Sequence, residues 1–170
     1  ANMNLDAAAV DLMLDKEANQ MTRLKEVLQQ VEDRYDYCFI DCPPGVGINV
    51  LNALVAANDV IIPIKADKNA LDGMEELTEV IEEVRPYNPG LSMVKCLVTM
   101  FTNDIEVVKG EEALQKSTYS TFYTHIRHSK KVNAWTFEKG KSLVEVTPKS
   151  AATRDYKNLA LEYMDLTKGA

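Results

Sequence analysis

Nine residues decide how this chain is interpreted: Phe39-Ile40-Asp41-Cys42-Pro43-Pro44-Gly45-Val46-Gly47. The apolar run from Cys38 to Ile40 is typical of a buried strand, and it ends on the carboxylate of Asp41. The chain then turns through Pro43-Pro44-Gly45. A lone Asp at the carboxyl end of a parallel strand lies where open α/β sheets bind ligands. Such an Asp commonly holds Mg²⁺ or its water beside a nucleotide phosphate, so the stretch indicates half of a nucleotide site.

Helices and strands alternate along the rest of the sequence. Apolar periodicity predicts helices over 7–31, 47–57, 74–84, 104–117 and 150–167, strands over 37–42, 59–64 and 91–100, a short β-rich run over 120–126, and a loop or short helix over 129–141. The last helix is expected to be amphipathic, with an apolar set of Tyr156, Leu159, Ala160, Tyr163 and Met164. The alternation predicts an α/β fold with a mostly parallel sheet and helices on both faces. No repeat or linker interrupts it, which predicts one domain over 1–170.

Composition narrows the class of protein. With 170 residues, 46% hydrophobic and 26% charged, the chain has the make-up of an ordinary globular domain. No apolar run is long enough to span a bilayer, and residues 1–6 lack the basic region before an apolar one that is typical of a signal peptide, so we expect a cytoplasmic protein that does not bind membranes. The net charge of −7 argues against wholesale coating of nucleic acid. A local stretch, 125–141, nevertheless carries an excess of basic side chains that can contact phosphates.

The three cysteines form an odd set without a Cys-x-x-Cys spacing: Cys38, Cys42 and Cys96. Two of them flank or lie inside predicted strands. We therefore expect small buried apolar side chains in a reducing compartment, in preference to a metal or redox role.

The segments around Asp41 are more specific than the carboxylate itself, because an Asp at the end of a strand also serves as a simple cap. Residues 35–44 read YDYCFIDCPP, and residues 51–64 read LNALVAANDVIIPI. Together they resemble the ParA family of chromosome- and plasmid-partitioning ATPases, relatives of the MinD cell-division ATPases. The resemblance continues through 70–74 and 97–101, reaches back to 1–8, and is closest between 35 and 101.

The resemblance implies roles on the phosphate side of a nucleotide site. Asp41 is implied to be the Walker B acid, which contacts Mg²⁺ through water. Pro43, Pro44, Gly45 and Gly47 are implied to form the switch II turn, which senses the γ-phosphate.

The resemblance also implies a base side. Thr99 and Met100 fall where the family approaches the adenine base, and Arg127 and His128 fall in the family's Pro-Arg-Asn loop. Ile126 stands where that loop usually has proline, and His128 where it often has asparagine. These departures weaken the expectation of adenine contacts from the loop.

Two lysines follow that loop. Lys130 and Lys131, with Arg127, fall near a position that is often basic in the family and is associated with non-specific DNA binding. The alternative is a solvated basic loop without a ligand.

The sequence contains no phosphate-binding motif of the form Gly-x-x-x-x-Gly-Lys-Ser/Thr. The nearest candidate, Gly140-Lys141-Ser142, has Trp135 in place of the earlier glycine. The family carries this loop ahead of the region matched by Ala1, so the chain resembles the carboxy-terminal part of a ParA-like, P-loop NTPase-like domain. We expect ATP and Mg²⁺ in the full-length parent and no bound cofactor or hydrolysis in this chain alone. We also expect the Asp41 strand to lack a neighbour, which leaves either a differently closed sheet or an exposed edge.

The leading functional hypothesis is therefore part of a ParA-type ATPase that acts in plasmid or chromosome partitioning. The resemblance implies ATP-dependent dimerisation, non-specific DNA binding in the nucleoid and a centromere-binding ParB-like partner. The alternative is a non-catalytic ParA-like scaffold or regulatory interaction module. A MinD-like membrane-cycling ATPase ranks below both, because it needs a terminal basic amphipathic helix and residues 162–170 are short and acidic.

Overall fold

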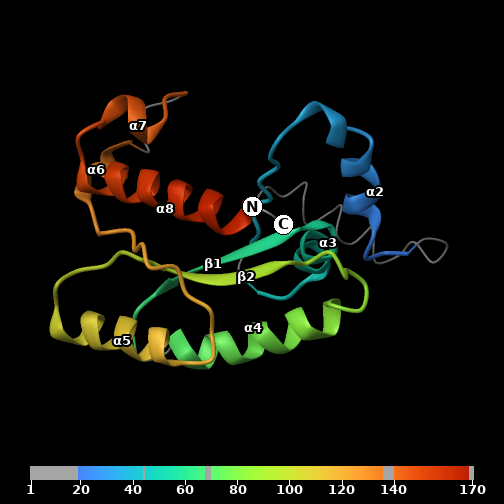
Figure 1. Ribbon diagram of the computed structural model, residues 1–170, viewed down its shortest axis with the longest axis horizontal. Coiled ribbons are helices and arrows are strands. Elements are labelled where there is room, and N and C mark those ends of the chain that lie inside the picture. The colour runs from blue at the N-terminus through green and yellow to red at the C-terminus, as the bar shows by residue number, and fades with distance from the viewer. Residues whose placement is uncertain (1–18, 44, 68–69, 136–139, 169–170) are drawn as a thin grey trace. The chain divides into compact units, whose positions relative to one another are not determined.

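A computed structural model of the chain describes residues 19–43, 45–67, 70–135 and 140–168 (Figure 1). Contacts divide the chain into two compact units. The first holds the described residues of Ala1–Val60 and of Met74–Met93, and the second holds those of Ile61–Gly73 and of Val94–Ala170. The prediction of one domain over 1–170 stays a prediction.

The first unit is helical. It contains α2 (Arg23–Gln29), the 3-10 helix η1 (Glu32–Arg34), α3 (Ile48–Ala56) and most of α4 (Ala70–Val84). The buried side chain of Asn52 ties α2 to α3, because its amide nitrogen donates to the carbonyls of Gln20 (2.7 Å) and Ile48 (3.0 Å) and its oxygen accepts from the backbone N–H of Leu24 (3.1 Å). Helices predicted over 47–57 and 74–84 are confirmed by α3 and α4.

The segment that precedes α3 differs from its prediction. Residues 37–43 form no strand, and Phe39, at the centre of the expected buried run, is 90% exposed. The prediction of a buried strand over 37–42 is therefore wrong for this structure. A strand is stabilised by pairing with a neighbour, and the sheet in the described part of the chain consists of β1 and β2 alone.

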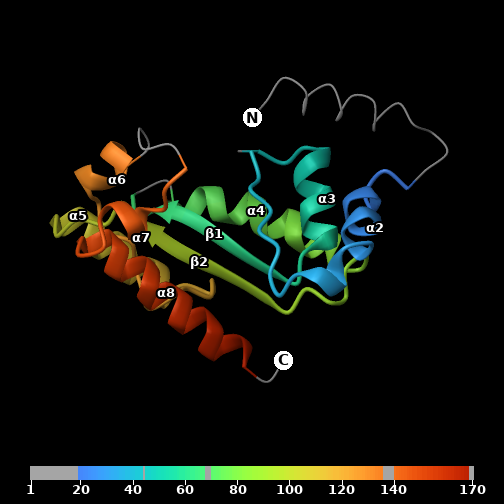
Figure 2. The ribbon, with the colours of Figure 1, turned by 90° about the horizontal axis from the view of Figure 1, so that it is seen from above.

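The sheet lies mainly in the second unit. The parallel strands β1 (Asp59–Lys65) and β2 (Met93–Thr99) are hydrogen-bonded neighbours whose arrows point the same way in Figure 2. The predicted β-rich run then follows the other edge of β2, through parallel bridges that join Cys96 to Thr121 and Phe101 to Arg127. The mostly parallel sheet expected from the sequence is thus confirmed.

Four helices complete the described part of the second unit: α5 (Ile105–Lys116), α6 (Lys130–Trp135), α7 (Leu143–Val146) and α8 (Ala151–Thr167). Figures 1 and 2 show α5 and α8 on opposite faces of the strands, as predicted. Gly110 lets α5 approach the chain just after β1, since a Cβ at this position would lie 2.7 Å from the carbonyl oxygen of Ala66. The short α7 was not predicted, although Ser142 and Glu145 form a capping box at its start.

The apolar set predicted for α8 is only partly buried, and polar residues of the helix are buried as well. Leu159 and Tyr163 are half-buried and the other members of the set are exposed, whereas Thr153 and Asp155 are buried. The reason is that α8 directs polar groups, described below, at the neighbouring backbone. Throughout the described residues, the helices fall short of the length and apolar character that crossing a bilayer requires.

Candidate functional site: the carboxyl end of β2

The end of β2 has an uncommon backbone. Met100 has φ 53°, in the left-handed region that non-glycine residues seldom adopt, and its side chain is 54% exposed. Just before it, the hydroxyl of Thr99 donates to the carbonyl of Ile64 (3.1 Å), which holds the ends of β2 and β1 together. Backbone strain of this kind persists where the surroundings enforce it, and it clusters at ligand sites.

The structure brings the second predicted base-side segment beside this strand end. The backbone N–H of Phe101 donates to the carbonyl of Ile126 (3.0 Å), and the N–H of His128 donates to the carbonyl of Phe101 (2.8 Å). Thr99 and Met100 therefore lie next to Arg127 and His128, as a shared base subsite would require. The replacements at 126 and 128 leave the pairing intact, because it uses backbone groups.

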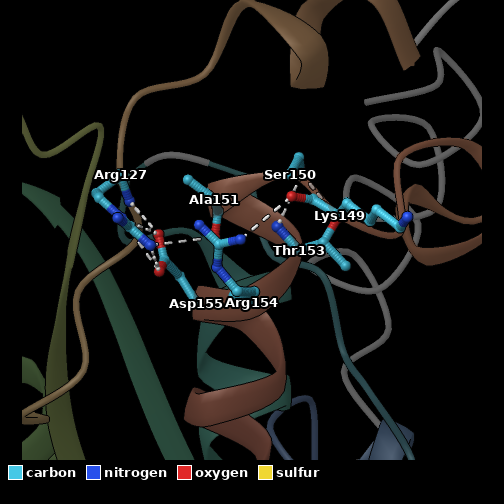
Figure 3. Close-up of polar contacts among 7 residues, drawn as sticks. All are labelled: Arg127, Lys149, Ser150, Ala151, Thr153, Arg154 and Asp155. Atoms are coloured by element: carbon cyan, nitrogen blue, oxygen red, sulfur yellow. Dashed lines mark hydrogen bonds and ion pairs between the residues drawn. The ribbon is translucent and has the colours of Figure 1, made fainter.

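Arg127 is held by an acid of α8 (Figure 3). Its Nη2 donates to Asp155 Oδ1 (2.6 Å), and its Nε and backbone N–H donate to Oδ2 (2.9 and 3.0 Å). The Asp155 side chain is 7% exposed and that of Arg127 43%. Burial alone would raise the pKa of Asp155, but the hydrogen bonds from Arg127 and the electrostatic effects of Arg127 and His125 outweigh burial and lower it. The carboxylate is thus ionised at neutral pH, and the pair is charge-assisted.

A second acid, from α5, holds the residue before this loop. The ring of His125 stacks on that of Phe101, with centroids 3.8 Å apart and 14° between the planes. Its Nδ1 lies 2.8 Å from Glu111 Oε1. The end of β2 is therefore fixed from both faces of the sheet, by Glu111 of α5 and by Asp155 of α8.

The predicted phosphate-side residues lie in the other unit. Asp41 and Gly45 are exposed, Gly45 has φ +99°, and Gly47 is the N-cap of α3. Pro43 is half-buried, and Pro44 lies outside the described residues. The structure thus describes the two predicted halves of the site within separate units.

The residues present fit a nucleotide with Mg²⁺ only in part. Among the described residues, no cluster of three or more His, Cys, Asp or Glu is arranged to hold a metal ion. A single exposed carboxylate such as Asp41 suits contact with Mg²⁺ through water. The backbone cradle and lysine that phosphates need have no motif in this sequence.

The two lysines predicted to contact DNA lie on a short helix. Lys130 and Lys131 are exposed on the first turn of α6, next in sequence to the base-side loop.

The three cysteines differ in burial. Cys96 is buried, and burial raises the pKa of its thiol to about 11 despite the nearby charge of Lys95. Cys38 and Cys42 are exposed, so the expectation of three buried cysteines is wrong for these two.

Sequence reasoning missed the acids that organise the loop. Glu162 of α8 accepts from the backbone N–H groups of Tyr123 (2.7 Å) and Thr124 (2.8 Å), as Asp155 does from Arg127. The available signal was their spacing of seven residues, which places both acids on one face of a helix. The prediction for this helix considered its apolar residues instead.

Several proteins of known identity are similar to this chain in sequence. Residues 1–93 match the AAA domain family. The chromosome partitioning protein ParA of Myxococcus xanthus is 41% identical over 102 residues, 59% of this chain and 35% of that protein. The chromosome-partitioning ATPase Soj of Thermus thermophilus is 33% identical over 168 residues, 96% of this chain and 64% of that protein. The chain thus spans between about a third and two thirds of these relatives.

Solved structures share the fold. A putative plasmid partition protein of Borrelia burgdorferi, bound to AMPPNP, aligns with a TM-score of 0.73 and 20% identity over 92% of this chain and 60% of that one. Cobyrinic acid a,c-diamide synthase of Mycobacterium smegmatis aligns with a TM-score of 0.72 and 22% identity over 96% of this chain and 61% of that one. Both support the α/β, P-loop NTPase-like fold predicted from the sequence. On the family match and these relatives together, the chain belongs to the ParA family of partitioning ATPases.

Proposed function

We propose that the protein containing this chain is an ATPase that acts in plasmid or chromosome partitioning through ATP-dependent dimerisation and non-specific DNA binding. The observation that carries the proposal is the pairing of 99–101 with 126–128 in a chain that resembles Soj along nearly its whole length. The proposed setting is the cytoplasm, at the nucleoid, with a second copy and a centromere-binding ParB-like protein as partners.

Different residues of the chain are proposed to contact the metal, the phosphates and the base. Asp41 would hold Mg²⁺ through a water, and the turn of Pro43, Pro44, Gly45 and Gly47 would respond to the γ-phosphate. When bound, Mg²⁺ neutralises charge on the phosphates during transfer. The base would lie against the left-handed turn at Met100, where the backbone of 99–101 pairs with the loop of 126–128.

These 170 residues by themselves are proposed not to hydrolyse ATP, because their sequence lacks the Gly-Lys loop. The same observation favours the second candidate, a non-catalytic ParA-like scaffold or regulatory module. The coding sequence upstream of Ala1 discriminates the two: an in-frame Gly-Lys-Thr loop favours the ATPase, and its absence favours the scaffold.

Phosphate release from Mg-ATP tests the ATPase directly. In the full-length protein, Asp41→Asn should lower turnover roughly 10- to 100-fold, the range for losing an outer-shell metal partner. Asp36→Asn is the matched control, because Asp36 is an exposed acid of the same segment and should leave turnover unchanged. Robust Mg-dependent turnover by the 170 residues alone would overturn the assignment of the missing phosphate loop.

The salt dependence of binding to non-specific duplex DNA tests the second activity. Lys130→Ala and Lys131→Ala should each lower the slope of log affinity against log salt by about 1 if each lysine neutralises one phosphate. Arg127→Ala should change the slope less, because Asp155 already neutralises that guanidinium. The exposed Lys109 of α5 supplies the control substitution to Ala. Equal slopes for the wild type and all four variants would remove this surface from DNA binding.

A further inference from the structure

We propose that Asp155 is a positioning residue for the nucleotide base. It acts through Arg127, whose guanidinium it holds in one orientation at the carboxyl end of β2, and it thereby sets the affinity for adenine. This inference rests on the proposed function, because it takes 99–101 and 126–128 to be the base subsite.

The first step concerns the two edges of the segment 120–128. Its inner edge pairs with β2, through backbone bonds such as that from Phe122 N–H to the carbonyl of Cys96 (2.9 Å). Its outer edge meets no further strand in the described part of the chain. The N–H groups of Tyr123, Thr124 and Arg127 donate instead to the carboxylates of Asp155 and Glu162. Helix α8 thus takes the place of a neighbouring strand at this edge.

The second step concerns the two carboxylates, which accept hydrogen bonds from different groups. Glu162 accepts from backbone groups alone at residues 123–124, away from the end of β2. Asp155 accepts from the backbone of Arg127 and also from two guanidinium nitrogens. A bidentate carboxylate fixes the plane of a guanidinium as well as its position. Of these two acids of α8, Asp155 is therefore the one that controls a side chain at the proposed subsite.

The third step is the rigidity of the turn that carries Asp155 (Figure 3). Ser150 caps α8, with its hydroxyl accepting from Thr153 N–H (3.1 Å), and the Thr153 hydroxyl donates to the carbonyl of Thr147 (2.6 Å). Arg154 bonds the carbonyl of Lys149 (3.3 Å). The carboxylate is thus presented from an anchored first turn and is nearly inaccessible to water, whereas the guanidinium that it orients is half-exposed. A fixed, accessible guanidinium plane can stack on a nucleotide base.

The test separates base binding from phosphate binding in the full-length protein. Dissociation constants are measured by calorimetry for ATP, GTP and inorganic tripolyphosphate, for the wild type and for Asp155→Asn. We expect Asp155→Asn to weaken ATP roughly tenfold, the cost of losing a charge-assisted hydrogen bond, and to leave tripolyphosphate unchanged. The preference for ATP over GTP should fall by the same factor.

Glu162→Gln is the matched control, since it removes the charge of the other acid on the same face of α8. It should leave all three constants unchanged. An equal loss of ATP affinity in Glu162→Gln, or an Asp155→Asn protein that melts earlier but keeps its ATP preference, would reduce Asp155 to a structural role and overturn the proposal.

Arg127→Lys keeps the inference testable if the Asp155 variant does not fold. It retains the positive charge and loses the planar fork, so it should show the same selective loss of ATP, and unchanged ATP affinity would overturn the proposal. A wild-type protein that binds ATP no better than tripolyphosphate would instead refute the base subsite and, with it, the proposed function.

Discussion

Two regions of this molecule were predicted to meet one nucleotide, and they are built in opposite ways. The segment 37–47 has the more distinctive sequence, yet its described residues form no strand, Phe39 is exposed, and open space surrounds Gly45 and Gly47. The end of β2 departs from the family pattern at Ile126 and His128, yet backbone pairing, a ring stack and two helices hold it. A distinctive motif therefore indicates which chemistry a segment can perform. Whether the segment is held in one conformation depends on the strands, rings and helices that contact it.

The largest expected difference between the regions lies in two phenylalanines. Phe122 is 1% exposed and Phe39 is 90% exposed. Phe122→Ala should lower the free energy of unfolding of the chain by about 3–5 kcal/mol, because it leaves a cavity in the core. Phe39→Ala should change it by less than about 0.5 kcal/mol, as at most exposed positions. Chemical denaturation of both variants measures this contrast.

A costly Phe39→Ala would break the comparison. If its loss of stability approached that of Phe122→Ala, residues 37–42 would be buried and paired in solution, as their sequence predicts. Hydrogen exchange of the amides of 38–41 distinguishes these states independently, since unpaired exposed amides exchange early.

Two glycines give the next largest contrast. In Gly110→Ala the new Cβ would lie 2.7 Å from the oxygen and 3.0 Å from the carbon of the Ala66 carbonyl, so backbone must move. We expect a loss of about 1–3 kcal/mol, which exceeds the gain of about 1 kcal/mol in helix propensity. Gly47→Ala, at an open position with negative φ, should cost at most about 1 kcal/mol, which is the advantage of glycine over alanine at a helix N-cap. A Gly110→Ala protein as stable as the wild type would show that α5 does not contact the chain after β1.

The sequence was sufficient where local pattern and pairing agree. The apolar runs of β1 and β2 and the intervening α4 predicted parallel pairing correctly, because both strands find their neighbour in the described part of the chain. The same reasoning wrongly predicted a strand at 37–42, because an apolar run indicates only that burial of its side chains would be favourable. It also did not foresee that α8 buries Asp155, a charged residue whose burial is compensated by Arg127.

The candidate site shows the same division. Thr99, Met100, Arg127 and His128 could be placed together from their sequence resemblance, and the backbone of β2 brings them side by side. The contacts that Glu111 and Asp155 make with the loop could not be predicted, since both acids are far from it in sequence and the spacing of Asp155 and Glu162 indicates only a shared helix face. Long-range ion pairs of this kind become visible only once helices are placed over the sheet.

The ring stack at the end of β2 supplies a smaller contrast. His125→Ala should cost about 1 kcal/mol, because stacked aromatic pairs contribute about 0.5–1.5 kcal/mol beyond their buried area. Tyr35→Ala, which removes an exposed ring before the Asp41 turn, should cost less than about 0.5 kcal/mol. Equal effects in urea titrations would mean that the two ends of the predicted site are equally ordered.

The smallest effect is confined to acidic pH and concerns Asp155. Because Arg127 and His125 lower its pKa in the folded protein, the ionised form stabilises the fold. This contribution is fully present above the unfolded-state pKa of about 3.9 and is lost as the pH falls through the lower folded-state value. The stability difference between wild type and Asp155→Asn should therefore be constant from about pH 7 to pH 5 and shrink below about pH 4. In an Arg127→Met background the shrinkage should be weaker, since the main partner of the carboxylate is gone. A difference that grows on acidification would mean that burial outweighs the hydrogen bonds of Arg127, and that the end of β2 is held less firmly than its geometry indicates.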